Sequence, residues 1–401
     1  MDQVSKYLST YAEPEVDLLG SFTDGYFQHV LIIPAYRETT AFIDPYINGK
    51  FSSLLLILVI NQPNDESDCS PQQQLYNHLD TNCPTLWHNQ HLTLFECADP
   101  SSAILCIRRY EADLRMKPNQ GVGIARKIAA DCALKLTQTM HVGSHWIAST
   151  DADAELPHDY FRQLQLQQRV AALTFNFQHH VTDGAVSQAT QLYEQSLRYY
   201  QAGLAWAGSS YAFYSLGSCI AINTFDYAKV RGFPKRSGGE DFYLLNKLAK
   251  IGTVQHCPEV TITIRSRRSD RVPFGTGPAV AKILQLDKPA LYQYYHPEVF
   301  RELQICLNGL SRLSTAEQIT DWQDCLEPIH FEWLMAQGLE RIFLHQQRQN
   351  ITQEQLQQHI THWFDGLMTL RFIHHMRDTA HSNCYLVDAL EISPFYSTIS
   401  T

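Results

Sequence analysis

The 401-residue chain lacks the features that mark several protein classes. Its longest apolar run, Leu54–Ile60, is too short to span a bilayer. Its N-terminus has no apolar segment of the kind that secretory signal peptides carry. No two of the ten cysteines stand at C-x-x-C spacing, which argues against a structural zinc site. We therefore expect a cytoplasmic protein with mostly reduced cysteines and no integral membrane segment.

Charged residues are also sparse, at 18% of the chain, and their balance is acidic. The formal net charge of -10 argues against general nucleic-acid binding, because phosphate backbones are bound by basic surfaces. A hydrophobic fraction of 44% is ordinary for a soluble globular protein. The length suffices for a sizeable core and for two or three domains.

The first 180 residues alternate between strand-like and helix-like segments. Short apolar or β-branched runs predict strands at 29–37, 53–60, 91–97, 145–150 and 171–177. Helical spacing and helix-start signals predict helices at 73–80, 121–137 and 157–170. This alternation predicts an α/β fold with a mostly parallel sheet flanked by helices.

From about residue 285 the composition shifts to Gln, His and Leu, and strand-like runs vanish. Amphipathic helices are predicted at 297–312, 327–346, 352–370 and 371–381. We therefore expect two domains, a catalytic domain at 1–284 and a helical C-terminal domain at 285–401. The helical domain is a candidate for dimerisation or for docking an acceptor.

Asp151 and Asp153 directly follow the predicted strand at 145–150. Two carboxylates two residues apart on extended chain point to the same side and can face one cation. Oxygen ligands of this kind suit Mg²⁺, which can in turn hold a diphosphate. The alternative interpretation is an acidic turn that caps the helix beginning near Pro157.

Glu240 and Asp241 follow Gly238-Gly239 at the start of an apolar helical pattern. Glycine permits positive φ and the close approach of a ligand, and a carboxylate here could take a proton from an attacking hydroxyl. Acidic residues in a first helical turn are also ordinary helix chemistry, because they complement the helix dipole.

Arginines cluster shortly before a Gly-x-Gly at 275–277. Guanidinium groups bind phosphate bidentately, so the cluster suggests a site for a diphosphate. A solvated charge run is the alternative, and neighbouring arginines on extended chain can face opposite ways. The cluster consists of Arg265, Arg267, Arg268 and Arg271.

Five motifs in this order resemble those of family-2 glycosyltransferases with the GT-A fold, over roughly residues 29–280. The matching segments are 32–38 (IIPAYRE), 121–127 (GVGIARK), 151–153 (DAD), 217–222 (GSCIAI) and 231–241 (RGFPKRSGGED). The resemblance implies a Rossmann-like, mixed but mostly parallel sheet flanked by helices.

The resemblance also implies site roles. Asp153 would be the direct ligand of Mn²⁺ or Mg²⁺, assisted by Asp151. Asp241, or failing it Glu240, would be the general base. The family has an acidic pair after its second strand, where this chain has Asn61-Gln62-Pro63-Asn64-Asp65, and Asp65 is the candidate substitute. The remaining donor-binding candidates are Pro34, Tyr36, Glu38, Arg126, Arg265, Arg268 and Arg271.

The implied activity is transfer of a sugar from a UDP- or GDP-type donor to a saccharide or other small hydroxyl acceptor, with inversion. Two alternatives stay open. One is a retaining GT-A synthase acting on a small anion such as glycerate or phosphoglycerate. The other is a non-catalytic module that binds a sugar nucleotide. The absence of the C-terminal membrane helices of polymerising members favours single transfer. A homodimer is a further candidate assembly, with the helical domain as its interface.

Overall fold

The computed structural model describes residues 2–22, 25–167, 169–181, 184–267, 275–313, 319–349 and 351–395. By its internal contacts the chain divides into two compact units. The first comprises residues 1–190 and 213–281, and the second comprises residues 191–212 and 282–401. The predicted boundary, between residues 284 and 285, is three residues from the division after residue 281. No pattern in the sequence indicated that residues 191–212 belong to the second unit.

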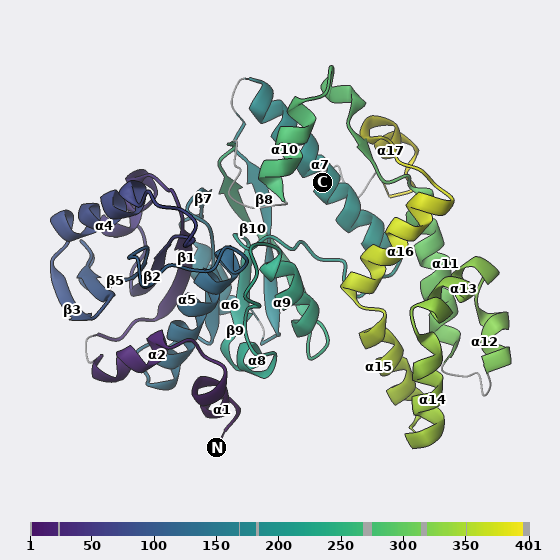
Figure 1. Ribbon diagram of the computed structural model, residues 1–401, viewed down its shortest axis with the longest axis horizontal. Coiled ribbons are helices and arrows are strands. Elements are labelled where there is room, and N and C mark those ends of the chain that lie inside the picture. Colours follow the sequence, from purple (N-terminus) through teal and green to yellow (C-terminus); the bar gives the residue numbers. More distant parts are fainter. Residues whose placement is uncertain are drawn as a thin grey trace. The chain divides into compact units, whose positions relative to one another are not determined.

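Within the described residues, the first unit is built around a ten-stranded sheet (Figure 1). The strand order is β3-β4-β5-β2-β1-β6-β9-β8-β10-β7. The strands are β1 (His29–Ala35), β2 (Leu54–Asn61), β3 (Thr85–Asn89), β4 (Leu92–Glu96), β5 (Ala103–Arg109), β6 (Trp146–Ser149), β7 (Ala154–Glu155), β8 (Ala172–His179), β9 (Ile220–Asn223) and β10 (Val254–Ile264).

The sheet is mixed but mostly parallel, as predicted. Strands β5, β2, β1 and β6 are successive parallel neighbours, and β8 is parallel to β10. The antiparallel members are β4, β9 and β7. All eight residues of β2 are buried, which explains its uninterrupted apolar sequence, since a central parallel strand is covered on both faces.

Helices flank this sheet, and α5 packs against β1 and β2. The helices that lie wholly in the first unit, or reach into it, are α1 (Gln3–Thr10), α2 (Glu15–Leu18), α3 (Asp44–Ile47), α4 (Ser70–Asn82), α5 (Gly121–Gln138), α6 (Tyr160–Leu166), α7 (Ala185–Trp206), α8 (Thr224–Lys229), α9 (Glu240–Leu248) and α10 (Thr276–Leu284). Short 3₁₀ turns occur at Leu19–Ser21 and Thr40–Phe42.

The apolar spacing that predicts α5 is the spacing of its buried face. Ile124, Ile128, Ala129, Cys132 and Leu136 are each no more than 2% exposed. Fully burying a side chain of leucine or isoleucine size stabilises a fold by about 1.5–3 kcal/mol. The helix is therefore held firmly on the sheet, and its first turns are fixed beside the ends of β1 and β6.

A buried polar network joins α1 to α5 and α8. The Tyr7 hydroxyl donates to Asp131 Oδ1 at 2.6 Å, and the Tyr227 hydroxyl donates to the same atom at 2.8 Å. Lys127 Nζ donates to Tyr7 at 2.7 Å and to Asp131 Oδ2 at 2.9 Å. A buried charge is costly without partners, so this network fixes the rotation of α5 about its axis.

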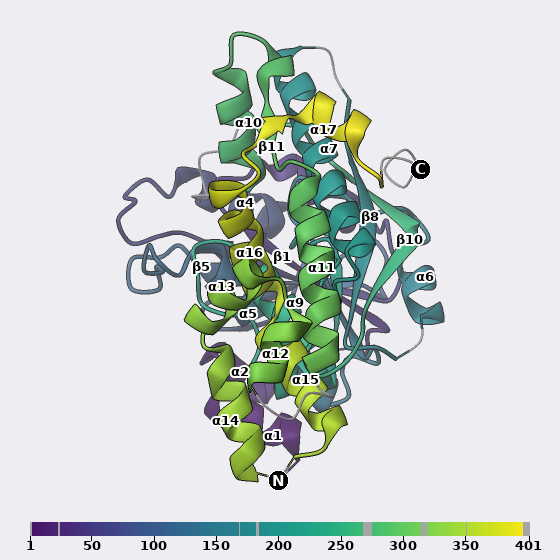
Figure 2. The same cartoon turned by 90° about the vertical axis from the view of Figure 1, so that its right-hand side faces the viewer.

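The second unit is mainly helical, and α11 lies beside α16 (Figure 2). Its helices beyond α7 are α11 (Glu298–Arg312), α12 (Ile319–Cys325), α13 (Pro328–Ala336), α14 (Leu339–Gln349), α15 (Gln353–Trp363), α16 (Gly366–Thr379) and α17 (Leu386–Ile392). A 3₁₀ turn at Pro289–Leu291 precedes a two-stranded antiparallel sheet of β11 (Gln293–Tyr294) and β12 (Cys384–Tyr385).

Three expectations for this region were wrong. The helix predicted at 327–346 is broken between α13 and α14, where Gly338 takes a φ of +98° that ends a helix. The helix predicted at 352–370 is broken before α16, whose first amides at Leu367 and Met368 are capped by Asp365. Strands do occur after residue 285, as β11 and β12. In the described residues, no helix is long and apolar enough to cross a membrane.

Candidate active site

The Asp151-Ala152-Asp153 segment lies where β1 and β6 separate. The two strands pair in parallel only at Leu31 and Ile32 of β1, and Thr150 N donates the next bond to Ile32 O at 3.1 Å. Pro34, two residues further along β1, is buried and has no N–H to continue this ladder. Both aspartates therefore stand at the carboxyl edge of the parallel strands, where α/β sheets place their ligands.

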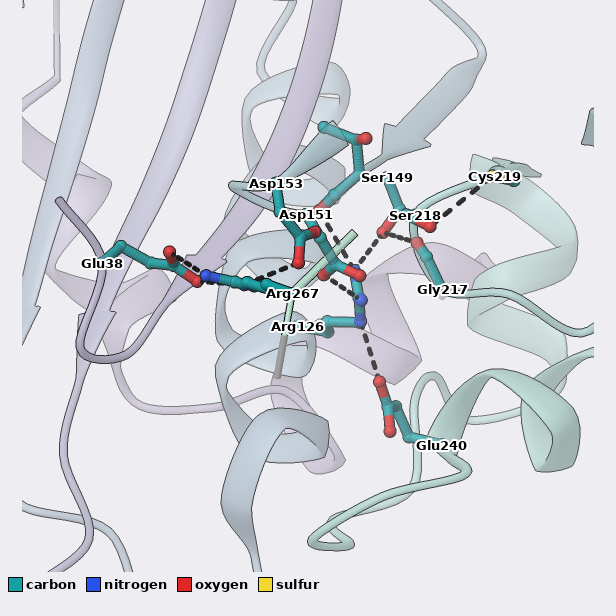
Figure 3. Close-up of polar contacts among 11 residues, drawn as sticks. Glu38, Arg126, Ser149, Asp151, Asp153, Gly217, Ser218, Cys219, Glu240 and Arg267 are labelled. Carbon is teal, nitrogen blue, oxygen red and sulfur yellow. Dashed lines mark hydrogen bonds and ion pairs between the residues drawn. The ribbon is translucent and has the colours of Figure 1, made fainter. Parts of the chain in front are cut away.

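Arg126 on α5 is the centre of the site and is only 2% exposed (Figure 3). Its Nη2 lies 2.5 Å from Asp151 Oδ1, and its Nε lies 2.8 Å from Glu240 Oε1. Its Nη1 donates to Ser149 Oγ at 2.7 Å. Burial alone lowers the pKa of Arg126, but the charges of Asp151 and Glu240 outweigh it and raise the pKa above its ordinary value.

Two glycines of the predicted motifs stand where an added Cβ would clash. A Cβ on Gly217 would lie 2.5 Å from Arg126 Nη2, and the Gly217 carbonyl accepts from Ser149 Oγ at 2.9 Å. A Cβ on Gly123 would lie 2.5 Å from the Pro234 carbonyl oxygen. The glycines of the predicted motifs therefore allow one chain segment to approach another.

Glu240 and Asp241 differ sharply in their surroundings, although both begin α9. Gly239 caps the helix with a φ of +69° and directs Glu240 inward to Arg126, where it is 3% exposed. Asp241 Oδ1 accepts from the Phe242 amide at 2.7 Å. Burial, reinforced by the charge of Glu240, raises the pKa of Asp241 to about 7. Asp241 is therefore suited to exchange a proton near neutral pH.

Arg267 joins the second aspartate of the motif to the end of β1. Its two terminal nitrogens each lie 2.8 Å from an oxygen of Glu38, and Nη2 also lies 2.6 Å from Asp153 Oδ2 (Figure 3). Burial, with the charge of Asp151 next in size, raises the pKa of Asp153 to about 6. Burial likewise raises the pKa of Glu38.

Arg267 was named in the arginine cluster, but only Arg265, Arg268 and Arg271 were selected as donor-binding candidates. The Arg265 side chain is 53% exposed and pairs with Glu155 at 3.2 Å, and its backbone amide donates to the Asp153 carbonyl at 2.8 Å. Arg268 and Arg271 lie outside the described residues. Side chains alternate in direction along extended chain, so Arg265 and Arg267 are expected to share one side. That pattern does not reveal that Arg267 pairs with Glu38 and Asp153.

At the end of β2, Glu66 rather than Asp65 makes the contacts that matter to the site. Asp65 is exposed. Glu66 Oε2 accepts from the Tyr36 hydroxyl at 3.2 Å and from Arg37 Nη2 at 2.6 Å. Arg37 takes a φ of 52°, uncommon for a residue with a side chain. Glu66 is an acidic residue that the sequence did not single out.

Three carboxylates of the predicted site lie at this edge of the sheet. Glu38, Asp151 and Asp153 provide carboxylate oxygens, the ligands that Mg²⁺ prefers and Mn²⁺ accepts. The guanidinium of Arg267 already bridges two of them as a cation. Among the described residues, no three histidine, cysteine or acidic side chains form a group that could hold a metal ion by themselves. A cation here would therefore draw further oxygen ligands from a phosphate or from water.

A separate small cavity lies at the opposite end of β6, next to His145. Its wall consists of His145, Gln167, Arg169, Asn223, Thr224 and Phe225. Because His145 precedes β6 and Asp151 follows it, this cavity does not contain the candidate site.

No protein-family model and no curated protein sequence matches this chain.

Proposed function

We propose that the protein transfers a sugar from a nucleotide-sugar donor of the UDP or GDP type to an acceptor hydroxyl, with Asp241 as the general base. The observation that carries the proposal is the Arg126 contact to both Asp151 and Glu240. These contacts join Asp151, a proposed cation ligand, to Glu240, the neighbour of the proposed base Asp241. The order of sequence motifs supports the same conclusion.

Asp151 and Asp153 would hold Mn²⁺ or Mg²⁺, with the donor diphosphate completing the coordination. When bound, such a cation neutralises the negative charge that develops on a departing nucleoside diphosphate. Arg126 is too deeply buried to serve as the main phosphate ligand, so its contribution is to orient Asp151. Tyr36 and Glu66 lie at the ends of β1 and β2, on the side expected for the nucleoside.

Asp241 would accept the proton from the acceptor hydroxyl as the acceptor oxygen bonds to the anomeric carbon. The bond from that carbon to the diphosphate oxygen breaks, and the nucleoside diphosphate leaves with the electron pair. Glu240 is held by Arg126, and its negative charge adds to the effect of burial in raising the pKa of Asp241. A general base is efficient when its pKa is near the working pH. A large fraction of it is then ionised, and the ionised form still takes up a proton readily.

The direct test is binding of UDP-, GDP-, dTDP- and CMP-sugars, with and without Mn²⁺, measured by thermal unfolding. A ligand at a hundred times its dissociation constant adds about 2.7 kcal/mol to the free energy of unfolding. We expect one nucleotide to stabilise the protein only when Mn²⁺ is present, and Asp153→Asn to remove that effect. Absence of stabilisation by any nucleotide under either condition would contradict the proposal.

A further inference from the structure

Arg267 occupies the position of a cation between two acidic side chains from separate parts of the chain. Glu38 follows β1, Asp153 follows β6, and Arg267 follows β10. The guanidinium contacts both oxygens of Glu38 at 2.8 Å and Asp153 Oδ2 at 2.6 Å (Figure 3). Arginine stays protonated in proteins, so this positive charge cannot be removed by a change of protonation.

The same oxygens of Asp153 are those that a divalent cation would use. A cation at Asp153 would be repelled by the guanidinium held there, because like charges at such short range oppose one another. The two positive groups therefore compete for one carboxylate. The Arg267 side chain is 32% exposed, which leaves it room to move away from Asp153.

Arg267 also has hydrogen-bonding capacity to spare. Within the described residues its Nε is buried without a hydrogen-bond partner, although both terminal nitrogens are engaged. The planar guanidinium matches the oxygens of a phosphate group as well as those of a carboxylate. An arginine released from Asp153 could therefore bind a diphosphate through two parallel bonds.

We propose that Arg267 is an exchangeable cation that occupies the Asp153 site before a divalent cation binds and then transfers to the donor diphosphate. This inference rests on the proposed function, because it assumes a nucleoside diphosphate beside Asp153. It assigns to Arg267 two opposite effects. Arg267 weakens metal binding to the free protein, and it strengthens nucleotide binding to the metal-loaded protein.

The two effects are separable in binding experiments that need no acceptor and no turnover. Calorimetry measures Mn²⁺ binding to the full chain alone, and then UDP and GDP binding at saturating Mn²⁺. In Arg267→Met we expect Mn²⁺ affinity to rise about tenfold and nucleoside diphosphate affinity to fall about tenfold, a coupling of ordinary size. Arg162→Met is the control, because Arg162 is exposed and pairs with Asp159, and it should change neither Mn²⁺ nor nucleotide affinity more than about twofold.

A second variant covers the case in which Arg267→Met does not fold. Arg267→Lys keeps the positive charge but loses the paired donors. Its Mn²⁺ affinity should stay near that of the parent, while its nucleotide affinity falls.

The outcomes separate the two proposals. Unchanged or weaker Mn²⁺ binding in Arg267→Met, with normal binding in the parent protein, would show that Arg267 is a fixed structural brace. That result would overturn the exchange and leave the proposed function standing. If the parent binds neither Mn²⁺ nor any nucleotide while it remains folded, both proposals fail.

Discussion

Arg126 Nε lies 2.8 Å from Glu240 Oε1, and both side chains are almost completely buried, at 2% and 3% exposed. The two residues are 114 positions apart in the chain. The pair connects the helix that packs on the sheet to the helix that begins with the candidate base. It is therefore the first place to test how the site is held together.

Removing Arg126 should destabilise the protein strongly. Arg126→Met leaves Glu240 and Asp151 without their counter-charge, and breaking a buried pair in this way costs about 3–5 kcal/mol. The free energy of unfolding in urea measures the effect. The matched control is Arg162→Met, which breaks an exposed pair with Asp159 and should cost less than about 1 kcal/mol. Equal effects of the two variants would contradict the assigned role of Arg126.

Asp241→Asn should abolish turnover and leave donor binding intact. Asparagine keeps the shape of the side chain and can still accept from the Phe242 amide, but it cannot take up a proton. For the parent protein we expect turnover to rise with pH through about 7, because the pKa of Asp241 is about 7 and the base must be ionised. Steady-state rates between pH 5 and 9 test this. Full activity of Asp241→Asn would show that Asp241 is not the general base. The anomeric configuration of the product tests whether the transfer inverts.

The same aspartate should lower the stability of the folded protein at high pH. Its pKa is about 7 in the fold, against an ordinary value of 3.8, so the native state holds more protons than the unfolded state between these values. The free energy of unfolding must then fall as pH rises through that window. After allowance for the partial exposure of the side chain, we expect Asp241→Asn to be about 1–2 kcal/mol more stable than the parent at pH 8. The gain should vanish near pH 4, and unfolding curves at the two pH values measure it.

Gly217→Ala should disturb the site through a steric clash. The added Cβ would lie 2.5 Å from Arg126 Nη2, and overpacking of this kind costs about 1–3 kcal/mol. Metal-dependent nucleotide binding should weaken as well, because Arg126 orients Asp151. Gly20→Ala is the control, since no atom lies within 4 Å of a Cβ at that position. A Gly217→Ala variant as stable as Gly20→Ala would show that the guanidinium is not held there.

Tyr7→Phe should show how much the first helix contributes to holding α5. The change keeps the ring but removes the hydroxyl that contacts Asp131 and Lys127. Buried polar groups that lose a partner cost about 1–3 kcal/mol each, so the free energy of unfolding should fall by that order. Tyr11→Phe, at the partly buried residue that follows α1, should have little effect. Chemical denaturation of both variants distinguishes the network from simple ring packing.

The sequence predicted those parts of the fold that local patterns encode. The spacing of Ile124, Ile128 and Leu136 predicted α5, and the continuous apolar run of β2 predicted a central strand. For β10 the sequence indicated only a strand without bounds that leads into the arginine cluster, because Pro258 interrupts its pattern. The structure accommodates that proline at an irregularity in the ladder between Cys257 and Thr261. Strand β5 was missed because its short apolar run ends in two arginines.

The candidate site was predictable in its residue types and less so in its pairings. Carboxylates after a strand and at a helix start indicated chemistry at Asp151, Asp153 and Asp241. Whether Asp65 or Glu66 turns toward Tyr36, and whether Arg265 or Arg267 turns toward Asp153, depends on the local backbone. A shift of one residue on extended chain reverses the direction of a side chain, and no pattern in the sequence resolves that choice.

The distance along the chain between Arg126 and Glu240 has a consequence for biosynthesis. A nascent chain that has emerged only as far as β6 can already form most of the neighbouring parallel strands, yet Arg126 must await a counter-charge that the ribosome has not made. The buried pair can therefore form only after residue 240 has been synthesised, so the site is completed late in translation.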